Sequence, residues 1–550
     1  MSRSNRPDLA IVNATIFTGR TLLEEASCVV VRNGKISAIG TETELQTQIQ
    51  MSQQVLDAKG GLLTPGFVDA HVHASFAGHE RLTCDVSGVG KRAGYRNVIQ
   101  NYAATVPEGE WITGAGWSMS RFPGGTPSAA ELDEIVADKP VYLVNRDHHG
   151  AWVNSKALAL AGIDAGTTDP ADGRIERLDN GLPQGTLHEG AMELMSTVLP
   201  TPSTQQMTAG ILEAQRYLVQ RGVTGWHEAI VGDYGGYPDV GPAYADALSS
   251  GQLRALVTGA LWLKRPEDDD AASPGAIAEV VRDLVARREA NAASGFRTDT
   301  VKIMVDGVIE NESAALDEQY LSSRCNCGLE YFGAEYLQAV VPALIAAGFN
   351  LHFHVIGDKA LRTALDALEQ IADPTESGRL RHHMAHLQLV NPADILRMKA
   401  LGVTANLQAL WACADAQMTE LTMPILGRER SQWQYPFASI EEAGVPLAMG
   451  SDWSVSTPDP WQAIHVAINR RPPGKENFEP LVASEALTLE SALEAYTLGS
   501  AALLGFPAKG IQVGEAANLA LADRNPFGIP SEQLCDITNV ATVIDGELWR

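Results

Sequence analysis

The chain has 550 residues, of which 45% are hydrophobic and 20% charged, and its formal net charge is -26. No apolar run is long enough to span a bilayer, and the acidity disfavours nucleic acid and anionic membrane surfaces as partners. No apolar stretch near the start precedes a small-residue cleavage site, so we expect a soluble cytoplasmic protein. The six cysteines are too sparse for a disulfide framework, and we interpret Cys325 and Cys327 as part of a loop.

Short β-rich runs separated by turns occupy both ends of the chain. Residues 1–64 contain three such runs, one with the hairpin signal Asn33-Gly34, and residues 505–550 contain two, one with Asp545-Gly546. Because isolated strands need partners, we predict that the two ends build one small β-sandwich domain together.

Between these ends the chain alternates strand-like and helix-like segments, which is typical of parallel βα units. Helical spacing is clear where Met207, Ile211, Ala214 and Leu218 recur and Gly222 follows as a cap. Eight stretches read as strands with polar or aromatic residues at their C-terminal ends: GFVDAHVH, GVTGWHEA, LRALVTGALWL, DTVKIMVDG, FNLHFHVIGD, HHMAHLQLV, GVTANLQAL and VPLAMGSDW. Residues 65–504 therefore predict a (β/α)₈ TIM barrel of the α/β class, with its active site at these strand ends.

One stretch interrupts the alternation. Residues 83–200 are too many for a loop without structure of its own. We predict an inserted subdomain that packs over the barrel mouth.

The first candidate site is the pair His71 and His73. Residues two apart in a strand face the same side, so the two rings converge on one point. Alone, the pair is equally compatible with solvated histidines. Further candidates stand near the ends of other strands, and their joint placement predicts a metal centre: Lys302, His354, His386 and Asp452.

Lys302 shares its strand parity with Met304 and Asp306, opposite to Val301 and Ile303. Burial lowers the pKa of a lysine and leaves a neutral amine. Such an amine can capture carbon dioxide as a carbamate, whose two oxygens can bridge two metal ions. The alternative is a lysine paired with a carboxylate such as Asp306.

Several motifs together resemble the amidohydrolase superfamily, specifically the amidohydrolase family 3, or YtcJ-like, branch that includes N-substituted formamide deformylases. They occur in the order PGFVDAHVH, VNRDHHGAWVNSKALALAGI, VKIMVDG, HFHVIGDKAL, HHMAHLQLV and GSDWSVSTPDPWQAI. The resemblance implies that one or two divalent metal ions, most often zinc, are held by the six candidates: His71, His73, Lys302 as a carbamate, His354, His386 and Asp452.

The resemblance also extends to residues around the centre. His354, not His352, matches the family position, although His352 shares its parity and can also reach the site. His149 and Glu189 match family residues that line the pocket from the insertion, whereas His148 stands where glycine is usual. Ala385 replaces a common glutamate and Asn518 a common aspartate, and neither change removes a ligand.

The reaction expected from this centre is hydrolysis of an amide-type C–N bond by metal-activated water. Asp452 is the predicted base, and His149 or His227 is the predicted donor to the oxyanion. Two alternatives stay open: the substrate could be a lactone, cyclic imide or heterocyclic amidine, or the protein could be a non-catalytic amidohydrolase-like scaffold. Either kind of protein could be a homo-oligomer such as a dimer.

Tryptophans stand at or just beyond several predicted strand ends and in the insertion. Aromatic walls favour apolar, flat substituents, so they predict a small-molecule amide with an aromatic or bulky apolar group. The predicted substrate contacts are Trp117, Trp152, Glu189, Trp226, Trp262, His352, Trp411 and Trp453. The alternative is that these rings only fill space between barrel and insertion.

Overall fold

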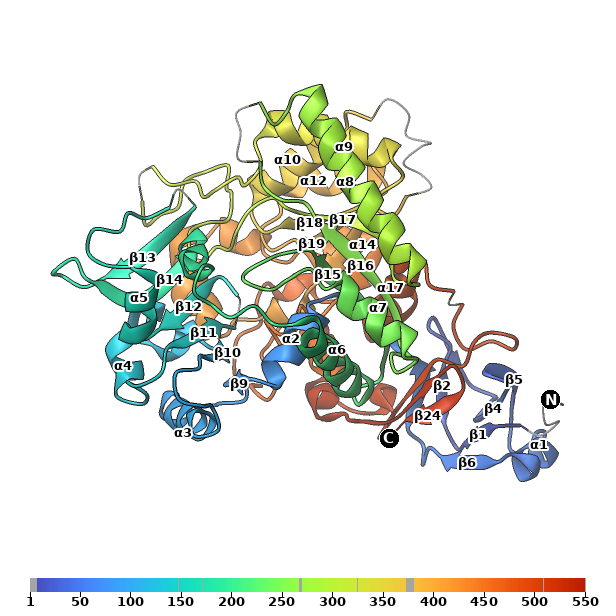
Figure 1. Ribbon diagram of the computed structural model, residues 1–550. Coiled ribbons are helices and arrows are strands. Elements are labelled where there is room, and N and C mark those ends of the chain that lie inside the picture. The colour runs from blue at the N-terminus through green and yellow to red at the C-terminus, as the bar shows by residue number, and fades with distance from the viewer. Residues whose placement is uncertain are drawn as a thin grey trace.

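The structure, a computed structural model, describes residues 7–146, 148–170, 172–266, 270–323, 325–371, 380–507 and 509–549. Eight parallel strands form its central sheet, in the order β21-β20-β19-β18-β17-β16-β15-β8 (Figure 1). Each predicted stretch overlaps one of them, which confirms the barrel. The strands are β8 (Phe67–Val72), β15 (Val223–Val231), β16 (Leu256–Trp262), β17 (Arg297–Met304), β18 (Asn350–Val355), β19 (His383–His386), β20 (Thr404–Leu407) and β21 (Leu447–Met449).

The seam between the first and last barrel strands is closed by hydrogen bonds between the segment that follows β21 and residues in or just after β8. Asp452 donates its backbone N–H to the His71 carbonyl at 2.7 Å, and His73 donates to the Trp453 carbonyl at 2.8 Å. Deeper in the seam, Ser451 donates to the Asp69 carboxylate at 2.9 Å. The barrel thus closes through the segments that carry the predicted ligands.

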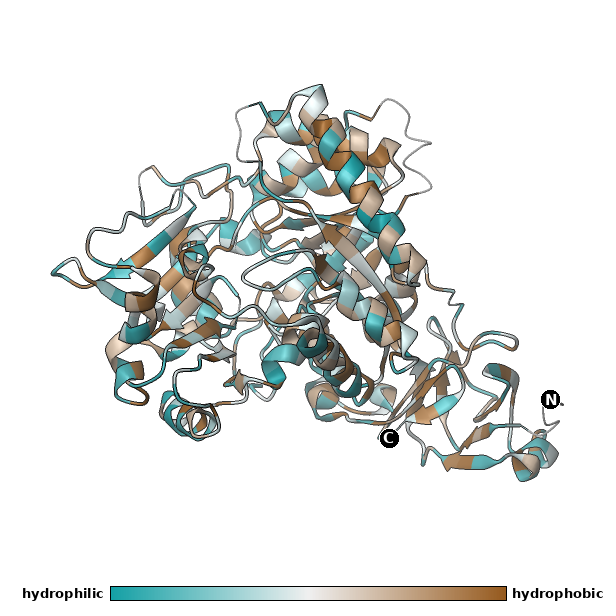
Figure 2. Cartoon of the chain, viewed as in Figure 1, coloured by the Kyte–Doolittle hydropathy of each residue, from teal (hydrophilic) through white to brown (hydrophobic). Residues whose placement is uncertain are grey.

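Helices surround the sheet, as βα units require. In α6 (Thr204–Val219), Ser203 and Gln206 form a capping box, the predicted apolar positions are buried, and Gly222 follows with φ +85°. Figure 2 shows polar and apolar residues along the same outer helices, as expected when one face packs on the barrel. The others are α2 (Ala74–Arg81), α7 (Gly241–Ser249), α8 (Pro274–Ala293), α9 (Ala334–Ala346), α10 (Asp358–Leu368), α12 (Pro392–Ala400), α14 (Phe437–Glu442) and α15 (Pro460–Asn469).

The two ends of the chain form a pair of sheets that share one core. The first contains only N-terminal strands: β5 (Lys35–Gly40), β4 (Cys28–Arg32), β1 (Leu9–Val12) and β6 (Gln54–Asp57). The second joins both ends: β24 (Glu547–Trp549), β23 (Asn539–Ile544), β22 (Leu519–Ala522), β7 (Leu62–Pro65), β2 (Thr15–Phe17) and β3 (Leu22–Leu23). Buried Ile11, Val31, Leu63, Leu521 and Val543 pack between them.

The insertion contains a six-stranded sheet with two hydrophobic clusters of its own, and it lies on the opposite side of the barrel from the terminal β sheets (Figure 1). Among the described residues, no helix has both the length and the apolar character needed to cross a membrane. The insertion consists of β9 (Cys84–Asp85), α3 (Arg92–Ala103), β10 (Ile112–Trp117), α4 (Ala129–Asp133), β11 (Val141–Asn145), β12 (Gly150–Val153), α5 (Ser155–Ala161), β13 (Gly173–Arg177) and β14 (Pro183–Glu189).

We keep the predicted boundaries as a proposal: residues 1–64 with 505–550, residues 65–504, and the insertion 83–200. Residues 1–6, 508 and 550 of the terminal segments lie outside the described ranges.

Candidate metal centre

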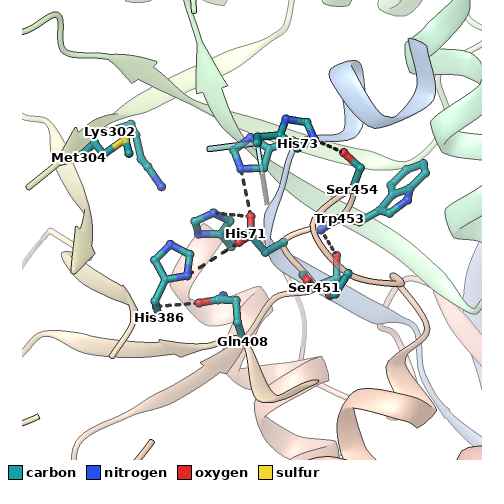
Figure 3. A network of polar contacts seen from close by, with 12 residues as sticks. His71, His73, Lys302, Met304, His386, Gln408, Ser451, Trp453 and Ser454 are labelled. Carbon is teal, nitrogen blue, oxygen red and sulfur yellow. Dashed lines mark hydrogen bonds and ion pairs between the residues drawn. The ribbon is translucent and has the colours of Figure 1, made fainter. Parts of the chain in front are cut away.

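Four side chains, three of them fully buried, meet at the C-terminal end of the barrel. Asp452 Oδ1 lies 3.2 Å from His71 Nε2 and 3.0 Å from His73 Nε2. The potential ligand atoms of His71, His386 and Asp452 all lie within 4.8 Å of one another. Figure 3 shows these side chains directed toward a common point, with the Lys302 amine facing it from across the barrel.

The backbone of two of these residues is bent to direct their side chains inward. His383 and Ala385 face the barrel interior, so simple alternation would turn His386 toward the helices. His386 instead has φ +77°, and Asp452 has φ +53°. Both are left-handed conformations that cost free energy for non-glycine residues, and such strain is often found at functional sites. The His386 N–H is held by Gln408 Oε1 at 2.7 Å.

Burial keeps the imidazoles of the cluster neutral. It lowers the pKa of His71 to about 3, with Lys302 acting in the same direction, and it lowers the pKa of His386 well below the usual value. Burial acts to raise the pKa of Asp452, but the His71 and His73 rings together hold it well below its usual range. The cluster therefore offers neutral ring nitrogens beside an ionised carboxylate, the protonation states that metal ligands need.

Lys302 is 2% exposed and lies on β17 among these groups. Burial lowers the pKa of its amine to about 7. No carboxylate of the described residues lies within ion-pair distance of Nζ, and Asp306 instead accepts three backbone N–H groups, from Ala315, Ile356 and Gly357. The pairing with Asp306 that we considered from the sequence is absent from the described residues.

His354 and its neighbours complete the barrel side of the site. Its ring centroid lies 4.3 Å from that of His386, and its Nε2 lies 3.3 Å from the Gly307 carbonyl oxygen. Burial lowers its pKa well below the usual value. The structure thus brings all six predicted ligands into one region of the barrel mouth, around one cavity lined by each of them.

The insertion contributes an imidazole–carboxylate pair. His149 Nδ1 lies 2.8 Å from Glu189 Oε2, and Ser313 and Asn311 of the barrel donate to Glu189 Oε1 at 2.9 and 3.2 Å. Burial acts to raise the pKa of Glu189, but His149 lowers it to about 2. His149 lines the cavity, whereas Glu189 lies behind it. Glu189 therefore does not line the cavity, where a substrate contact was predicted; it holds the His149 ring in place through a hydrogen bond.

A second insertion histidine also reaches the cavity. His148 Nε2 lies 2.7 Å from Ser454 Oγ and 3.4 Å from Glu80 Oε1. Its ring stacks on His73 with a centroid distance of 6.4 Å. The sequence signalled this residue only as a departure from a usual glycine.

The cavity lined by the six predicted ligands, which we call the metal cavity, is small, with a volume of about 50 Å³. A neighbouring chamber of about 160 Å³ shares Val308, Trp411 and Val455 with it. The aromatic residues of the metal cavity are Phe76, Tyr234 and Trp411, whose ring stacks on His386 at 5.1 Å. Phe76 and Tyr234 were missed, although Phe76 stands three residues after His73 on a helix start, a spacing that brings side chains together.

Most of the predicted tryptophan contacts lie elsewhere. Trp117 and Trp152 pack with Phe122 inside the insertion, and their Nε1–H groups donate to the carbonyls of Leu143 and Ser128. These two rings fill the core of the insertion and do not line the cavity.

Of the four barrel tryptophans that were predicted to contact substrate, three lie outside the cavity and one lines it. Trp226 donates to the Tyr244 hydroxyl, and Trp453 stacks on Tyr217 and points away from Lys302 (Figure 3). Trp226 precedes the inward-facing His227 in β15 and so faces the helices, whereas Trp453 lies beyond the end of β21 and packs on Tyr217 of α6. Trp262 lies behind Tyr234, at 4.8 Å between rings, and only Trp411 lines the cavity.

His227 and His352 lie one layer deeper than predicted. With His383 they form a buried group of three histidines below the metal cavity, which we call the inner layer. His227 Nδ1 lies 2.8 Å from Thr258 Oγ1, and neither His227 nor His352 lines the cavity. They are therefore out of reach as an oxyanion donor and a substrate contact.

The donor set fits a transition-metal ion. Both ring nitrogens of the buried His386 and Nδ1 of His73 lack a hydrogen bond in the described part of the chain. Imidazole nitrogens with a carboxylate suit zinc and its neighbours, whereas magnesium and calcium prefer oxygen ligands throughout.

Comparison with known proteins agrees with this geometry. Residues 54–549 match the profile of the amidohydrolase family. The chain belongs to this family. It is 26% identical to the putative amidohydrolase YtcJ of Bacillus subtilis, over 96% of this chain and 97% of that protein. It is 26% identical to the N-substituted formamide deformylase of Arthrobacter pascens, over 98% of both chains.

Two further matches extend the comparison to a plant and to a solved fold. Protein LONG AFTER FAR-RED 3 of Arabidopsis thaliana is 28% identical, over 98% of this chain and 91% of that protein. An uncharacterized metal-dependent hydrolase from Pyrococcus horikoshii has the same fold, with a TM-score of 0.70 and 23% identity over 95% of this chain and 99% of that chain.

Proposed function

We propose that this family member is a metal-dependent hydrolase that cleaves the C–N bond of an N-substituted amide or formamide bearing an aromatic or apolar group. The observation that carries the proposal is the cavity in which His71, His73, His386 and Asp452 converge as neutral imidazoles and an ionised carboxylate. That combination is what a hydrolytic metal site requires.

The six residues that would hold one or two divalent ions, most favourably zinc, are His71, His73, Lys302, His354, His386 and Asp452. Lys302 would do so as a carbamate. Burial lowers the pKa of its amine to about 7, so a substantial fraction is neutral near pH 7, and addition of carbon dioxide forms the N–C bond as one proton leaves. The resulting anion would balance part of the charge of the ions.

A divalent ion in this site supplies Lewis-acid polarisation of a carbonyl and makes water more acidic. Asp452, 3.0–3.2 Å from two ligand rings, is placed to take the proton from the attacking water. It then delivers that proton to the nitrogen of the leaving amine.

His149 supports the developing negative charge on the carbonyl oxygen. Its Nδ1 lies 2.8 Å from the ionised Glu189 carboxylate, so the proton in this contact is on Nδ1. When the ring carries a second proton, Nε2–H can donate to the oxyanion from the side of the insertion.

The sizes of the two spaces support a small acyl group. A water molecule needs roughly 10–15 Å³ on this volume scale, so about 50 Å³ accommodates water and a group of formyl or acetyl size. The N-substituent would then occupy the neighbouring 160 Å³ chamber, against the Trp411 and Tyr435 rings. The likeness to an N-substituted formamide deformylase supports the same bond.

The decisive experiment is a substrate screen of the zinc-loaded protein against N-formyl and N-acetyl amines, lactones, cyclic imides and heterocyclic amidines. We expect hydrolysis of formyl amines above all others. Activity confined to lactones or to the cyclic compounds would replace the proposed bond. Absence of any bound divalent metal in the purified protein would favour a non-catalytic scaffold.

A further inference from the structure

His352 touches two predicted metal ligands from below. Its Nε2 lies 2.9 Å from His71 Nδ1 and 3.4 Å from Lys302 Nζ. His352 is fully buried on β18, and its backbone pairs with Lys302 on one side and His383 on the other. The ring is therefore fixed between the metal cavity and the inner layer.

The direction of the His71–His352 hydrogen bond follows from how His71 faces the cavity. Its Nε2 faces Asp452, so Nε2 is the nitrogen available to a metal ion. A neutral imidazole has one N–H, which must then be on Nδ1. Nδ1–H consequently donates to His352 Nε2, which acts as the acceptor.

We infer that His352 is a positioning residue of the metal centre: as an acceptor it fixes the ring orientation and tautomer of His71. Hydrogen bonds of this kind to ligating histidines raise their basicity, and their loss typically weakens metal affinity about 10–100-fold. This inference rests on the proposed function only in taking His71 as a ligand.

The same assignment of protons to ring nitrogens excludes a second metal site among the inner-layer histidines. His227, His352 and His383 each offer a ring nitrogen within 4.8 Å of the other two, a spacing that could hold an ion. Several ring nitrogens of this layer make no hydrogen bond of normal geometry with described residues: His227 Nε2, His352 Nδ1 and both nitrogens of His383. The Arg381 backbone nevertheless interacts with the His383 ring and acts to raise its pKa. With His352 Nε2 accepting from His71, its proton is on Nδ1, and a protonated nitrogen cannot bind a metal.

The chain offers a matched set of variants for a test that needs no substrate. His352→Leu removes the acceptor while keeping an apolar side chain, and His352→Gln keeps an acceptor oxygen with similar reach. His383→Leu is the control, because His383 packs on His352 in the same layer, with 4.1 Å between ring centroids, and makes no hydrogen bond to His71 or Lys302 in the described structure. Zinc dissociation constants are measured by chelator competition, and thermal midpoints are measured without metal.

We expect His352→Leu to weaken zinc binding about 10–100-fold, His352→Gln to restore most of the loss, and His383→Leu to stay within about threefold of the parent. Equal affinity in His352→Leu and the parent would overturn the inference. So would equal losses in His352→Leu and His383→Leu, since that result describes a general packing effect.

Crystals of the zinc-loaded parent give a second measurement that does not depend on any variant folding. Anomalous density at the zinc edge is expected beside His71 Nε2, with His352 Nε2 still within hydrogen-bond distance of Nδ1. A peak among the inner-layer histidines overturns the tautomer assignment. A parent that binds zinc but hydrolyses no amide removes the proposed function and leaves this inference standing.

Discussion

Two groups of three buried side chains lie one above the other in this barrel, and they differ in what surrounds them. The upper group, His71, His386 and Asp452, contains a carboxylate and opens into a cavity. The inner layer contains only imidazoles and opens into none of the described cavities. Clustered histidines alone do not make a metal centre; a charge-balancing carboxylate and access for a ligand distinguish the upper group.

The largest expected effect comes from removing the charge of the upper group while keeping its shape. Asp452→Asn should reduce kcat by about 10³-fold, because the amide cannot take a proton from water. Zinc content should stay close to that of the parent, since an amide oxygen remains available as a ligand. Turnover is measured on a formyl amine, with metal analysis of the same sample. Near-parental turnover would remove Asp452 from the mechanism.

The next effect concerns Lys302, which faces the upper group across the cavity. Lys302→Ala should weaken zinc binding by at least about 10²-fold, more than loss of a supporting contact does. Added acetate or propionate should restore part of the activity by replacing the carbamate oxygens. Chelator competition and rescue rates provide the measurement. Full metal content with full activity would leave no role for a carbamate.

A smaller effect tests the chamber that opens from the upper group. An N-benzyl amide should be preferred over its N-methyl analogue, because burying one ring contributes roughly 2 kcal/mol, or about thirtyfold in kcat/KM. Trp411→Ala should reduce this ratio, whereas Trp453→Ala should preserve it, since Trp453 packs on Tyr217 instead. A ratio near one in the parent would contradict the aromatic chamber.

The smallest effect is expected in the inner layer. His383→Leu should change the free energy of unfolding by less than about 1 kcal/mol, because replacing a buried polar group that lacks normal hydrogen bonds by an apolar one is nearly neutral. Urea denaturation of both proteins without metal measures the difference. A loss of several kcal/mol would mean that His383 has a strong partner, and the two groups would then be more alike than we describe.

The sequence predicts the barrel well because period-two alternation and strand-helix repetition are local signals. Chemistry at strand ends follows from the fold rule, so His71, Lys302 and Asp452 could be placed without coordinates. The depth of a side chain within the barrel is harder to predict from such local patterns. His352 and His354 share one parity, and His352, two residues earlier in the strand, lies deeper; which of the two depths lines the cavity is given only by the assembled barrel.

Side-chain alternation along a strand is a local signal that predicts the direction of some of the tryptophans. Trp226 is adjacent to the inward-facing His227 within β15, so alternation already predicts that it faces outward. Trp117 and Trp152 could not be assigned in this way, because the sheet of the insertion has long-range pairings that no local pattern specifies. His386 is the opposite case, where a left-handed backbone overrides alternation.

The seam that closes the barrel also sets when the site can exist during synthesis. Its hydrogen bond from Ser451 to Asp69 joins residues 382 positions apart. At roughly 5–20 residues per second, a ribosome needs about 20–80 s to travel between them. Throughout that interval His71 and His73 emerge without Asp452, so a nascent chain has no complete ligand set to capture metal. Assembly of the centre is therefore a late event, tied to release of the C-terminal strands that also complete the terminal β sheets.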